Sequence, residues 1–343
     1  MLTPDHQRLL RLPKAELHVH LDGSLRPRTL LELARERRVD LPAADPQGVA
    51  RALLVSDASN LEEYLEAFRL TLAVMQDAEA IERIAFELAE DYAAEGVRWL
   101  EARFCPRLCT RGGLDAGEVL DAALAGLARA ERSTGIRAAV IVCALRSLPP
   151  AESVAMAELA VAYQRRGACA FDLAGAEAGY PVAHHLEALR KAEAAGLPIT
   201  IHAGEGFGSP SIRQALEIGH AVRIGHGTRL REDPELLASV RDSGVVLEVC
   251  LTSNVQTRVA ASYAAHPLRA YFDAGVRVSL CTDNRLMSGV TLTEEYEHAR
   301  DDLAFSWDEL VRVARTGLEA AFAPEVVRAG LLAELDAELA RIA

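Results

Sequence analysis

The amino-acid sequence predicts a (β/α)8 barrel that forms a single domain over residues 1–343. Three observations support this fold class. Strand-like runs occur eight times, alanine- and leucine-rich helical segments separate them, and no G-x-G-x-x-G turn follows the first run. Eight alternating units are typical of the barrel, whereas the alternative, a doubly wound sheet, favours the glycine-rich turn. Length alone leaves one large barrel or two ordinary domains open, and the eight units favour the barrel.

The strand-like runs are mostly continuous apolar stretches rather than strict alternations. This pattern is typical of parallel strands that are buried on both faces. We therefore expect a parallel sheet covered by helices. The runs cover residues 15–21, 97–104, 136–145, 168–175, 198–205, 221–228, 245–254 and 276–284.

Helical patterns fill the connections between these runs. Three of them, residues 115–135, 182–196 and 233–244, end on a glycine that can stop a helix. The connection between the first two strands is longer and predicts extra helices around a loop rich in proline and alanine. Those helical runs cover residues 29–38, 60–75 and 79–96. We expect the helices after residue 290 to pack outside the barrel or to cap one end.

Charge and composition exclude several classes of function. The formal net charge is −13 and basic runs are short, so we expect no nucleic-acid partner, while a small neutral or cationic substrate is compatible. No apolar stretch reaches the roughly 18 residues of a membrane helix. The N-terminal segment "MLTPDHQRLLRLPK" lacks a signal-peptide core. We expect a cytoplasmic protein without a membrane span, and the sequence does not indicate its oligomeric state.

Histidine and carboxylate side chains are concentrated at the carboxyl ends of the predicted strands. Catalytic groups of (β/α)8 barrels lie at this end. They are His18, His20 and Asp22 after the first strand, His202 and Glu205 after the fifth, His226 after the sixth and Asp283 after the eighth. The remaining histidines are interpreted as ordinary polar residues, namely His6, His184, His185, His220, His266 and His298.

The spacing of the histidines predicts a metal site. Side chains two residues apart point to the same face of a strand, so His18 and His20 can reach one ion. His202 and Asp283 would complete a set of three imidazoles and one carboxylate, which suits one Zn²⁺ ion per chain with an open position for water. Zinc lowers the pKa of its water from about 15.7 to about 7.

Three of the same residues are candidates for proton transfer at such a site. Glu205 lies at the same barrel end as the ligands and is a candidate general acid. His226 could orient a hydroxide or stabilise developing charge. Asp283 could accept the proton of the water as well as bind the metal.

Seven pieces of the sequence, in order between residues 16 and 289, resemble the adenosine deaminase family of the amidohydrolase superfamily. They are "ELHVHLDGSLRPRTL", "LEARFCPRL", "FDLAGAE", "TIHAGEGFG", "RIGHGT", "TSNVQT" and "SLCTDNRLMSG". The resemblance implies a TIM barrel and a zinc-dependent hydrolase of purine salvage. Its reaction would convert adenosine or 2′-deoxyadenosine to inosine and ammonia.

The resemblance also implies a role for each site residue. Glu205 would protonate N1 of the purine while hydroxide attacks C6, and His226 would position and polarise that hydroxide. Gly175 would donate its backbone N–H to N3, and Asp22 would contact the ribose. The zinc ligands would be His18, His20, His202 and Asp283, and the substrate contacts would be His20, Asp22, Gly175 and Asn284.

Two positions depart from the pattern of many family members. Asn284 replaces an aspartate that would contact N7, and an asparagine NH₂ can donate to N7 at any pH. Ala176 replaces a second aspartate, but the backbone contact from Gly175 would survive. The two variants occur together in some bacterial members of the family, so they do not argue against activity.

The resemblance further implies an apolar lid in the segment "NLEEYLEAF", although ordinary packing is an equal alternative. The residues expected to cover the site are Leu61, Tyr64, Leu65 and Phe68.

Other functions stay open at this point. The substrate could be another 6-aminopurine compound, such as aminodeoxyfutalosine of menaquinone synthesis, or free adenine. A non-catalytic purine-binding barrel is disfavoured because a binder needs no proton shuttle beside a metal. Two-metal amidohydrolases usually carry a bridging lysine after the fourth strand, which "ACAFDLAG" lacks. The cytidine deaminase type of site needs H-x-E with P-C-x-x-C, and neither is present.

Overall fold

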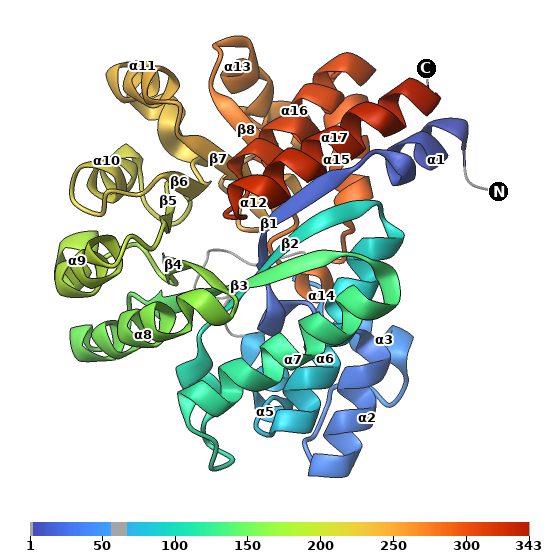
Figure 1. The fold of residues 1–343 in the computed structure, drawn as a ribbon, viewed down its shortest axis with the longest axis vertical. Helices are drawn as coiled ribbons and strands as arrows, with labels where there is room; N and C mark the ends of the chain where they lie inside the picture. Colours follow the sequence, from blue (N-terminus) through green and yellow to red (C-terminus); the bar gives the residue numbers. More distant parts are fainter. Residues whose placement is uncertain (1–2, 56–66, 343) are drawn as a thin grey trace.

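The computed structural model describes residues 3–55 and 67–342 of the chain. Eight parallel strands within these residues form one sheet in sequential order, with helices around the outside (Figure 1). The predicted (β/α)8 architecture is therefore confirmed. The strands are β1 (Lys14–His20), β2 (Val97–Phe104), β3 (Arg137–Leu145), β4 (Ala168–Ala174), β5 (Ile199–Ala203), β6 (Arg223–His226), β7 (Val246–Val249) and β8 (Arg277–Leu280).

The barrel closes between its first and last strands through a short contact beyond the end of β8. Val19 and Asp283 form an isolated parallel bridge. The backbone N–H of His20 donates to the carbonyl of Asp283 at 2.7 Å, and the N–H of Asp283 donates to the carbonyl of His18 at 2.8 Å. The backbone that closes the barrel thus places Asp283 directly beside the two histidines of β1.

The helices that connect successive strands lie mostly where the periodicity predicts them. The helix predicted at 115–135 begins at a capping box of Asp115 and Glu118 and ends at Gly135, whose φ of +79° suits glycine. The predicted helix at 182–196 divides into a 3-10 turn and a shorter α-helix. The connecting helices are α6 (Ala78–Ala94), α7 (Ala116–Thr134), α8 (Pro150–Tyr163), α9 (Leu186–Ala194), α10 (Ser209–Glu217), α11 (Pro234–Ser243), α13 (Leu268–Asp273) and α16 (Trp307–Ala320).

Additional helices occupy the long first connection and the two ends of the chain. They are α1 (Pro4–Arg11), α2 (Pro27–Arg37), α3 (Pro46–Leu53), α5 (Phe68–Val74), α15 (Leu292–Leu303) and α17 (Glu325–Ile342). Two further short helices are α12 (Leu251–Gln256) and α14 (Arg285–Ser288). The 3-10 turns are η1 (Leu21–Gly23), η2 (Pro106–Cys109), η3 (Gln164–Arg166), η4 (Val182–His185), η5 (Thr228–Glu232) and η6 (Tyr263–Ala265).

Two local predictions were wrong. The segment expected to be a proline- and alanine-rich loop contains α3, which begins because Asp45 accepts a hydrogen bond from the Gly48 N–H and Pro46 occupies the first helical turn. The run 245–254 was expected to be one strand, but β7 ends at Val249 and α12 begins at Leu251.

The expected lid falls mainly outside the described residues. Leu61, Tyr64 and Leu65 lie there, whereas Phe68 is the first residue of α5. Phe68 lines the cavity described below, together with Leu72 of the same helix.

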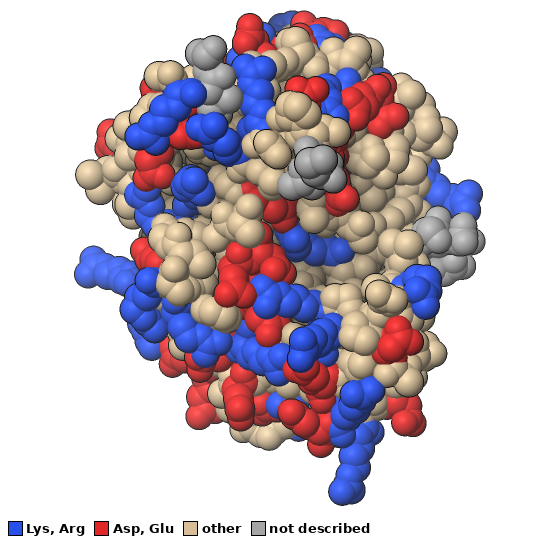
Figure 2. Space-filling view, turned by 90° about the vertical axis from the view of Figure 1, so that its right-hand side faces the viewer, with Lys and Arg blue, Asp and Glu red and all other residues tan. Residues whose placement is uncertain are grey.

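The outer surface carries both signs of charge. Basic and acidic side chains are interspersed over the face shown in Figure 2. Among the helices of residues 3–55 and 67–342, none has the length and apolar character needed to cross a membrane.

Charged side chains occupy the barrel interior. Arg103, Asp172 and Glu248 have no exposed surface, and Arg223 is 2% exposed. Burying an ion costs several kcal/mol unless partners compensate for it. Each of these groups therefore needs a partner of opposite charge or a hydrogen-bond partner. Two of them, Asp172 and Glu248, contact predicted site residues.

Candidate active site and metal centre

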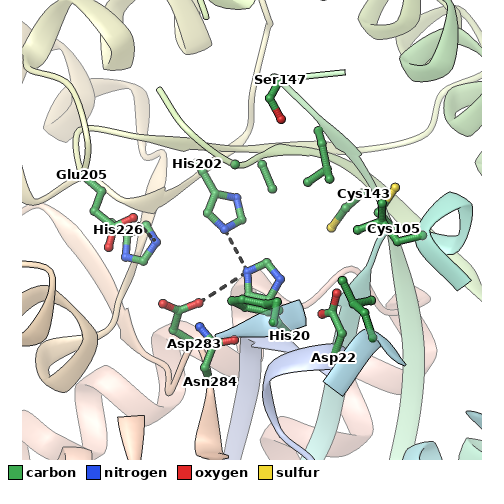
Figure 3. A pocket seen from close by; sticks show the side chains of 16 residues that line it. His20, Asp22, Cys105, Cys143, Ser147, His202, Glu205, His226, Asp283 and Asn284 are labelled. Carbon is green, nitrogen blue, oxygen red and sulfur yellow. Dashed lines mark hydrogen bonds and ion pairs between the residues drawn. The ribbon is translucent and has the colours of Figure 1, made fainter. Parts of the chain in front are cut away.

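The predicted site residues converge at the carboxyl end of the barrel, around a cavity of about 230 Å³. Figure 3 shows Glu205 and His226 on one side of this cavity and Asp22 on the other. His20, His202 and Asp283 lie between them. Of the predicted site residues, the cavity wall includes His20, Asp22, Gly175, His202, Glu205, His226, Asp283 and Asn284, while His18 lies beneath it and is fully buried.

The donor atoms of the predicted ligands are separated by distances suited to one zinc ion. Nε2 of His20 lies 3.1 Å from Nε2 of His202 and 3.4 Å from Oδ1 of Asp283. Nε2 of His18 lies 3.6 Å from the same oxygen. Ligands about 2.0–2.1 Å from a tetrahedral zinc lie roughly 3.3–3.4 Å apart. Three of the six ligand pairs therefore have separations compatible with one zinc ion.

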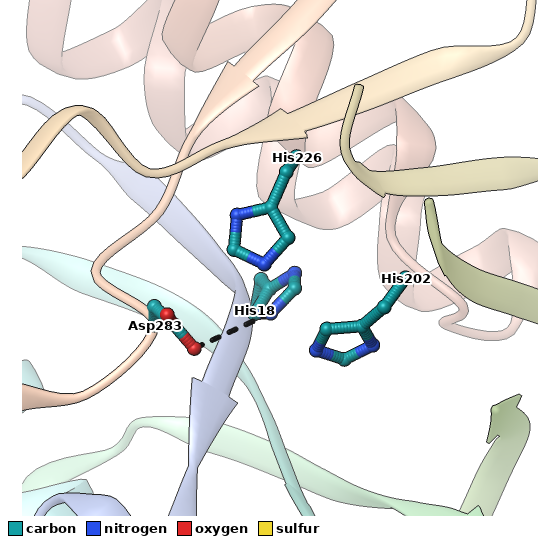
Figure 4. A group of neighbouring side chains, drawn as sticks. All are labelled: His18, His202, His226 and Asp283. Carbon is teal, nitrogen blue, oxygen red and sulfur yellow. Dashed lines mark ion pairs between the residues drawn. The ribbon is translucent and has the colours of Figure 1, made fainter. Parts of the chain in front are cut away.

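A second, overlapping set of donors includes His226. The atoms offered by His18, His202, His226 and Asp283 lie within 4.8 Å of one another (Figure 4). This set shares three members with the predicted one and exchanges His20 for His226. The hydrogen bonds of His226, described below, favour a role in proton placement.

Buried carboxylates orient two of the predicted ligands. Nδ1 of His18 lies 2.9 Å from Oε2 of Glu248, and Nδ1 of His202 lies 3.1 Å from Oδ1 of Asp172. A carboxylate only accepts, so each Nδ1 carries the proton and each Nε2 keeps a lone pair for the metal. Nε2 of His18 is buried and has no hydrogen-bond partner among the described residues, as expected of a metal ligand.

Arg103 connects these two carboxylates. Its guanidinium donates to Oδ2 of Asp172 at 3.2 Å and to Oε2 of Glu248 at 2.8 Å. Burial alone would raise the pKa of both acids, but Arg103 and the neighbouring histidine lower each of them below its usual range. Sequence reasoning missed Arg103, Asp172 and Glu248. Their signal is a charged residue inside a continuous apolar strand, which requires a buried partner.

Asp283 is held by both its backbone and its side chain. Its φ is +62°, in the left-handed region that non-glycine residues rarely adopt. Ser253 donates its hydroxyl to Oδ2 at 2.6 Å, so the other oxygen stays directed at the histidines. Burial would raise the pKa of Asp283, but His18 and His226 lower it below its usual range, which keeps the carboxylate ionised.

Glu205 is arranged to hold a proton. Burial raises its pKa well above the usual range, and the negative charges of Asp283 and Glu177 raise it further. Thr257 donates its hydroxyl to Oε1 at 3.1 Å, and Oε2 lies 3.4 Å from Nε2 of His226. A neutral carboxyl group at neutral pH can donate to a substrate, which is the property of a general acid.

His226 is held as a neutral ring of defined tautomer. Burial lowers its pKa well below the usual range. Nδ2 of Asn254 lies 3.0 Å from Nδ1, so Nδ1 accepts and Nε2 carries the proton. Asn254 is itself oriented because Thr228 donates to its Oδ1, and Nε2 of His266 lies 3.1 Å from the same atom. His266, expected to be an ordinary polar residue, therefore supports the site from behind.

Close packing explains one glycine of the "RIGHGT" segment. A Cβ on Gly225 would lie 2.9 Å from Cε1 of His18 and 3.2 Å from the Cα of His202. Any side chain there would displace a predicted ligand.

The substrate side of the cavity is mainly apolar. Leu72, Leu108 and Leu145 line it, and no lysine or arginine is among its described lining residues. Asp22 is 5% exposed, its Oδ1 has no hydrogen-bond partner among the described residues, and burial raises its pKa to about 7. Such an orphaned polar atom is suited to a hydroxyl group of a ligand.

Sequence comparison places this chain close to one family. A model described as adenosine deaminase matches residues 13–338. An adenosine deaminase from Clostridium acetobutylicum is 40% identical over 331 residues, which cover 96% of this chain and 99% of that protein. A probable adenosine deaminase from Dictyostelium discoideum is 44% identical over 88% of this chain, which spans only 39% of that longer protein.

Solved structures share the fold. An adenine deaminase from Arthrobacter aurescens has a TM-score of 0.89 at 27% identity, covering 96% of this chain and 99% of its own. An amidohydrolase from Burkholderia ambifaria, solved with bound Zn, has a TM-score of 0.89 at 26% identity, covering all of this chain and 96% of its own. An N6-mAMP deaminase from Arabidopsis has a TM-score of 0.86 at 29% identity, covering 96% of this chain and 99% of its own.

Proposed function

The chain belongs to the adenosine deaminase family of hydrolases, and we propose that it converts adenosine and 2′-deoxyadenosine to inosine or deoxyinosine with release of ammonia. One observation carries the proposal. Glu205, a buried carboxyl group whose pKa is raised well above its usual range, lies in the same cavity as a cluster of imidazole and carboxylate donors that could hold a zinc ion. Hydrolytic removal of an amino group from a purine needs both an acid for the ring and an activated water.

The proposed metal ligands are His18, His20, His202 and Asp283, holding one Zn²⁺ ion per chain. The supporting observations are the three separations between their donor atoms and the orphaned Nε2 of His18. When bound, zinc would supply hydroxide at neutral pH. The Zn-containing relative from Burkholderia ambifaria supports the choice of metal.

The proposed roles of the other residues follow from the protons they hold. Glu205 donates its proton to N1 of the purine, which makes C6 more electrophilic. His226 directs its Nε2–H at the attacking oxygen. Asp283, kept ionised, accepts the proton of that oxygen and passes it to the amino group, which leaves as ammonia while C6 becomes a carbonyl. The backbone N–H of Gly175 donates to N3 and the side chain of Asn284 to N7. These contacts would hold the ring flat against the reacting groups.

The cavity favours a nucleoside over a nucleotide. An Arabidopsis relative was solved with GMP and with IMP, whereas no lysine or arginine is among the described lining residues here and Asp22 is acidic. A 5′-phosphate would therefore have no cation to bind. Free adenine would leave Asp22 without a partner, which disfavours the second candidate function, adenine deamination, despite the likeness to the Arthrobacter enzyme.

We further propose a single domain and a cytoplasmic role in purine salvage. The family match over residues 13–338 supports one domain.

A substrate panel tests this proposal. We expect the zinc-loaded protein to release ammonia fastest from adenosine and 2′-deoxyadenosine. Release should be at least about 10²-fold slower from AMP, whose phosphate meets no cation, and from adenine, which leaves Asp22 without a partner. Aminodeoxyfutalosine completes the panel. A higher kcat/KM for any of the last three would replace the substrate assignment. No ammonia from any compound would overturn deamination.

A further inference from the structure

Glu177 is a buried acid, 4% exposed, that the proposed mechanism does not use. It lies in the turn between β4 and η4, and both of its carboxylate oxygens reach across to the turn after β5. Oε2 accepts from the N–H of Gly204 at 2.9 Å. Oε1 accepts from the N–H groups of Glu205 and Gly206, each at 2.8 Å.

These three bonds restrain the backbone that carries the general acid. Residues 204–206 follow the last residue of β5 and precede α10, so their N–H groups have no place in a strand or a helix. Buried N–H groups require acceptors. One side chain supplies an acceptor to all three, which couples the backbone position of Glu205 to that of Glu177.

The same turn also carries a substrate contact. Gly175, two residues before Glu177, lines the cavity and is proposed to donate to N3 of the purine, while Glu205 is proposed to donate to N1. N1 and N3 belong to one six-membered ring and flank the same carbon atom. The distance between the Gly175 and Glu205 donors must therefore match the fixed distance between N3 and N1. Glu177 connects the two turns that set the distance between these donors.

We propose that Glu177 is a positioning residue that holds the Glu205 turn at the correct separation from Gly175. This inference rests on the proposed function, because Glu177 would affect the rate by positioning Glu205 for proton donation to the purine. A displacement of about 1 Å between reacting groups can cost about 10²-fold in rate.

The substitution Glu177→Gln tests the role with little change of shape. The amide nitrogen cannot accept, so at least one of the three N–H groups loses its partner. We expect kcat for adenosine to fall about 10- to 100-fold, KM to change much less, and zinc content to stay at that of the wild type. Glu187→Gln, an exposed position on α9, is the matched control and should leave kcat unchanged.

A double-mutant cycle with Glu205→Gln separates positioning from a merely structural role. If Glu177 acts through Glu205, then Glu177→Gln should cost far less in the Glu205→Gln background than in the wild type. Equal costs in both backgrounds, or a wild-type kcat for Glu177→Gln, would overturn the inference alone. A wild-type kcat for Glu205→Gln would overturn the acid assignment and this inference with it.

A second variant keeps the test decisive if Glu177→Gln folds poorly. Glu177→Asp retains both oxygens but is shorter by one methylene, and we expect it to fold and to lose kcat rather than zinc. Wild-type kcat in folded Glu177→Asp would contradict the proposal.

Discussion

At the scale of single residues, the site depends on which nitrogen of each histidine carries the proton. His18 and His202 donate through Nδ1 to buried carboxylates and so direct Nε2 lone pairs inward. His226 accepts at Nδ1 from Asn254 and so presents an N–H instead. Three buried imidazoles at one barrel mouth thus present two lone pairs and one N–H to the site, and the difference comes from the partner behind each ring.

The carboxylate behind His202 is predicted to control metal affinity. In Asp172→Asn the side chain keeps its size but loses the charge that fixes the His202 tautomer and pairs with Arg103. We expect zinc affinity, measured by competition with a chelator, to fall about 10- to 100-fold. Asp242→Asn, at an exposed position on α11, is the control. An unchanged affinity in Asp172→Asn would show that the ring is oriented by packing alone.

The sequence predicts the residues that would face the proposed metal and misses those behind them. His18, His20, His202 and Asp283 are predictable because their spacing and their strand ends place them at one mouth. Asp172 and Glu248 are not, because the partner of a buried charge is set by the register between distant strands. His266 was missed for the same reason, since only the fold brings it to Asn254.

At the scale of elements, the helix α12 shows how a buried acid joins two segments. Glu295 of α15 accepts from the N–H groups of Leu251 and Thr252 at 2.9 and 3.0 Å, where α12 begins. Burial nevertheless raises its pKa from 4.5 to about 8. This contact could not be predicted, since the sequence favoured a continued strand over the same residues.

The raised pKa of Glu295 predicts a pH-dependent stability. Between pH 4.5 and about 8, Glu295 holds a proton in the folded protein but not in the unfolded chain. The contribution of Glu295 to the free energy of unfolding is therefore fully present below pH 4.5 and is lost as the pH rises through 8. We expect the free energy of unfolding of the wild type, relative to Glu295→Gln, to fall between pH 5 and pH 8 by up to about 1.4 kcal/mol per pH unit.

Urea unfolding of both proteins at several pH values measures this difference, with Glu187→Gln as the control. A difference that is independent of pH would mean that Glu295 does not change its protonation on folding.

The short bridge that closes the barrel involves a predicted site residue, Asp283. β8 ends at Leu280, and the pairing of Val19 with Asp283 continues the contact beyond it. The sequence places Asp283 at the end of the eighth strand but cannot show that this residue itself forms the closure. Its left-handed backbone is part of that geometry.

At the scale of the whole molecule, the eight-unit count predicts the architecture well because each unit is local in sequence. Strand boundaries at β5, β6 and β8 extend too far in the prediction, because the predicted runs include the turns that follow these strands. Those turns are buried like the strands, although most of their residues are glycine or polar. The interior of the barrel contains charged side chains that contact the predicted metal ligands, as well as aliphatic side chains. Buried ion pairs, such as those of Arg103 with Asp172 and Glu248, therefore help to position the site.

Metal removal tests the central claim most directly. The purified protein should contain about one zinc per chain and release ammonia from adenosine. Dialysis against a chelator should abolish turnover while circular dichroism shows an intact barrel. Added Zn²⁺ should then restore turnover. Full deamination activity in folded, zinc-free protein would contradict the account.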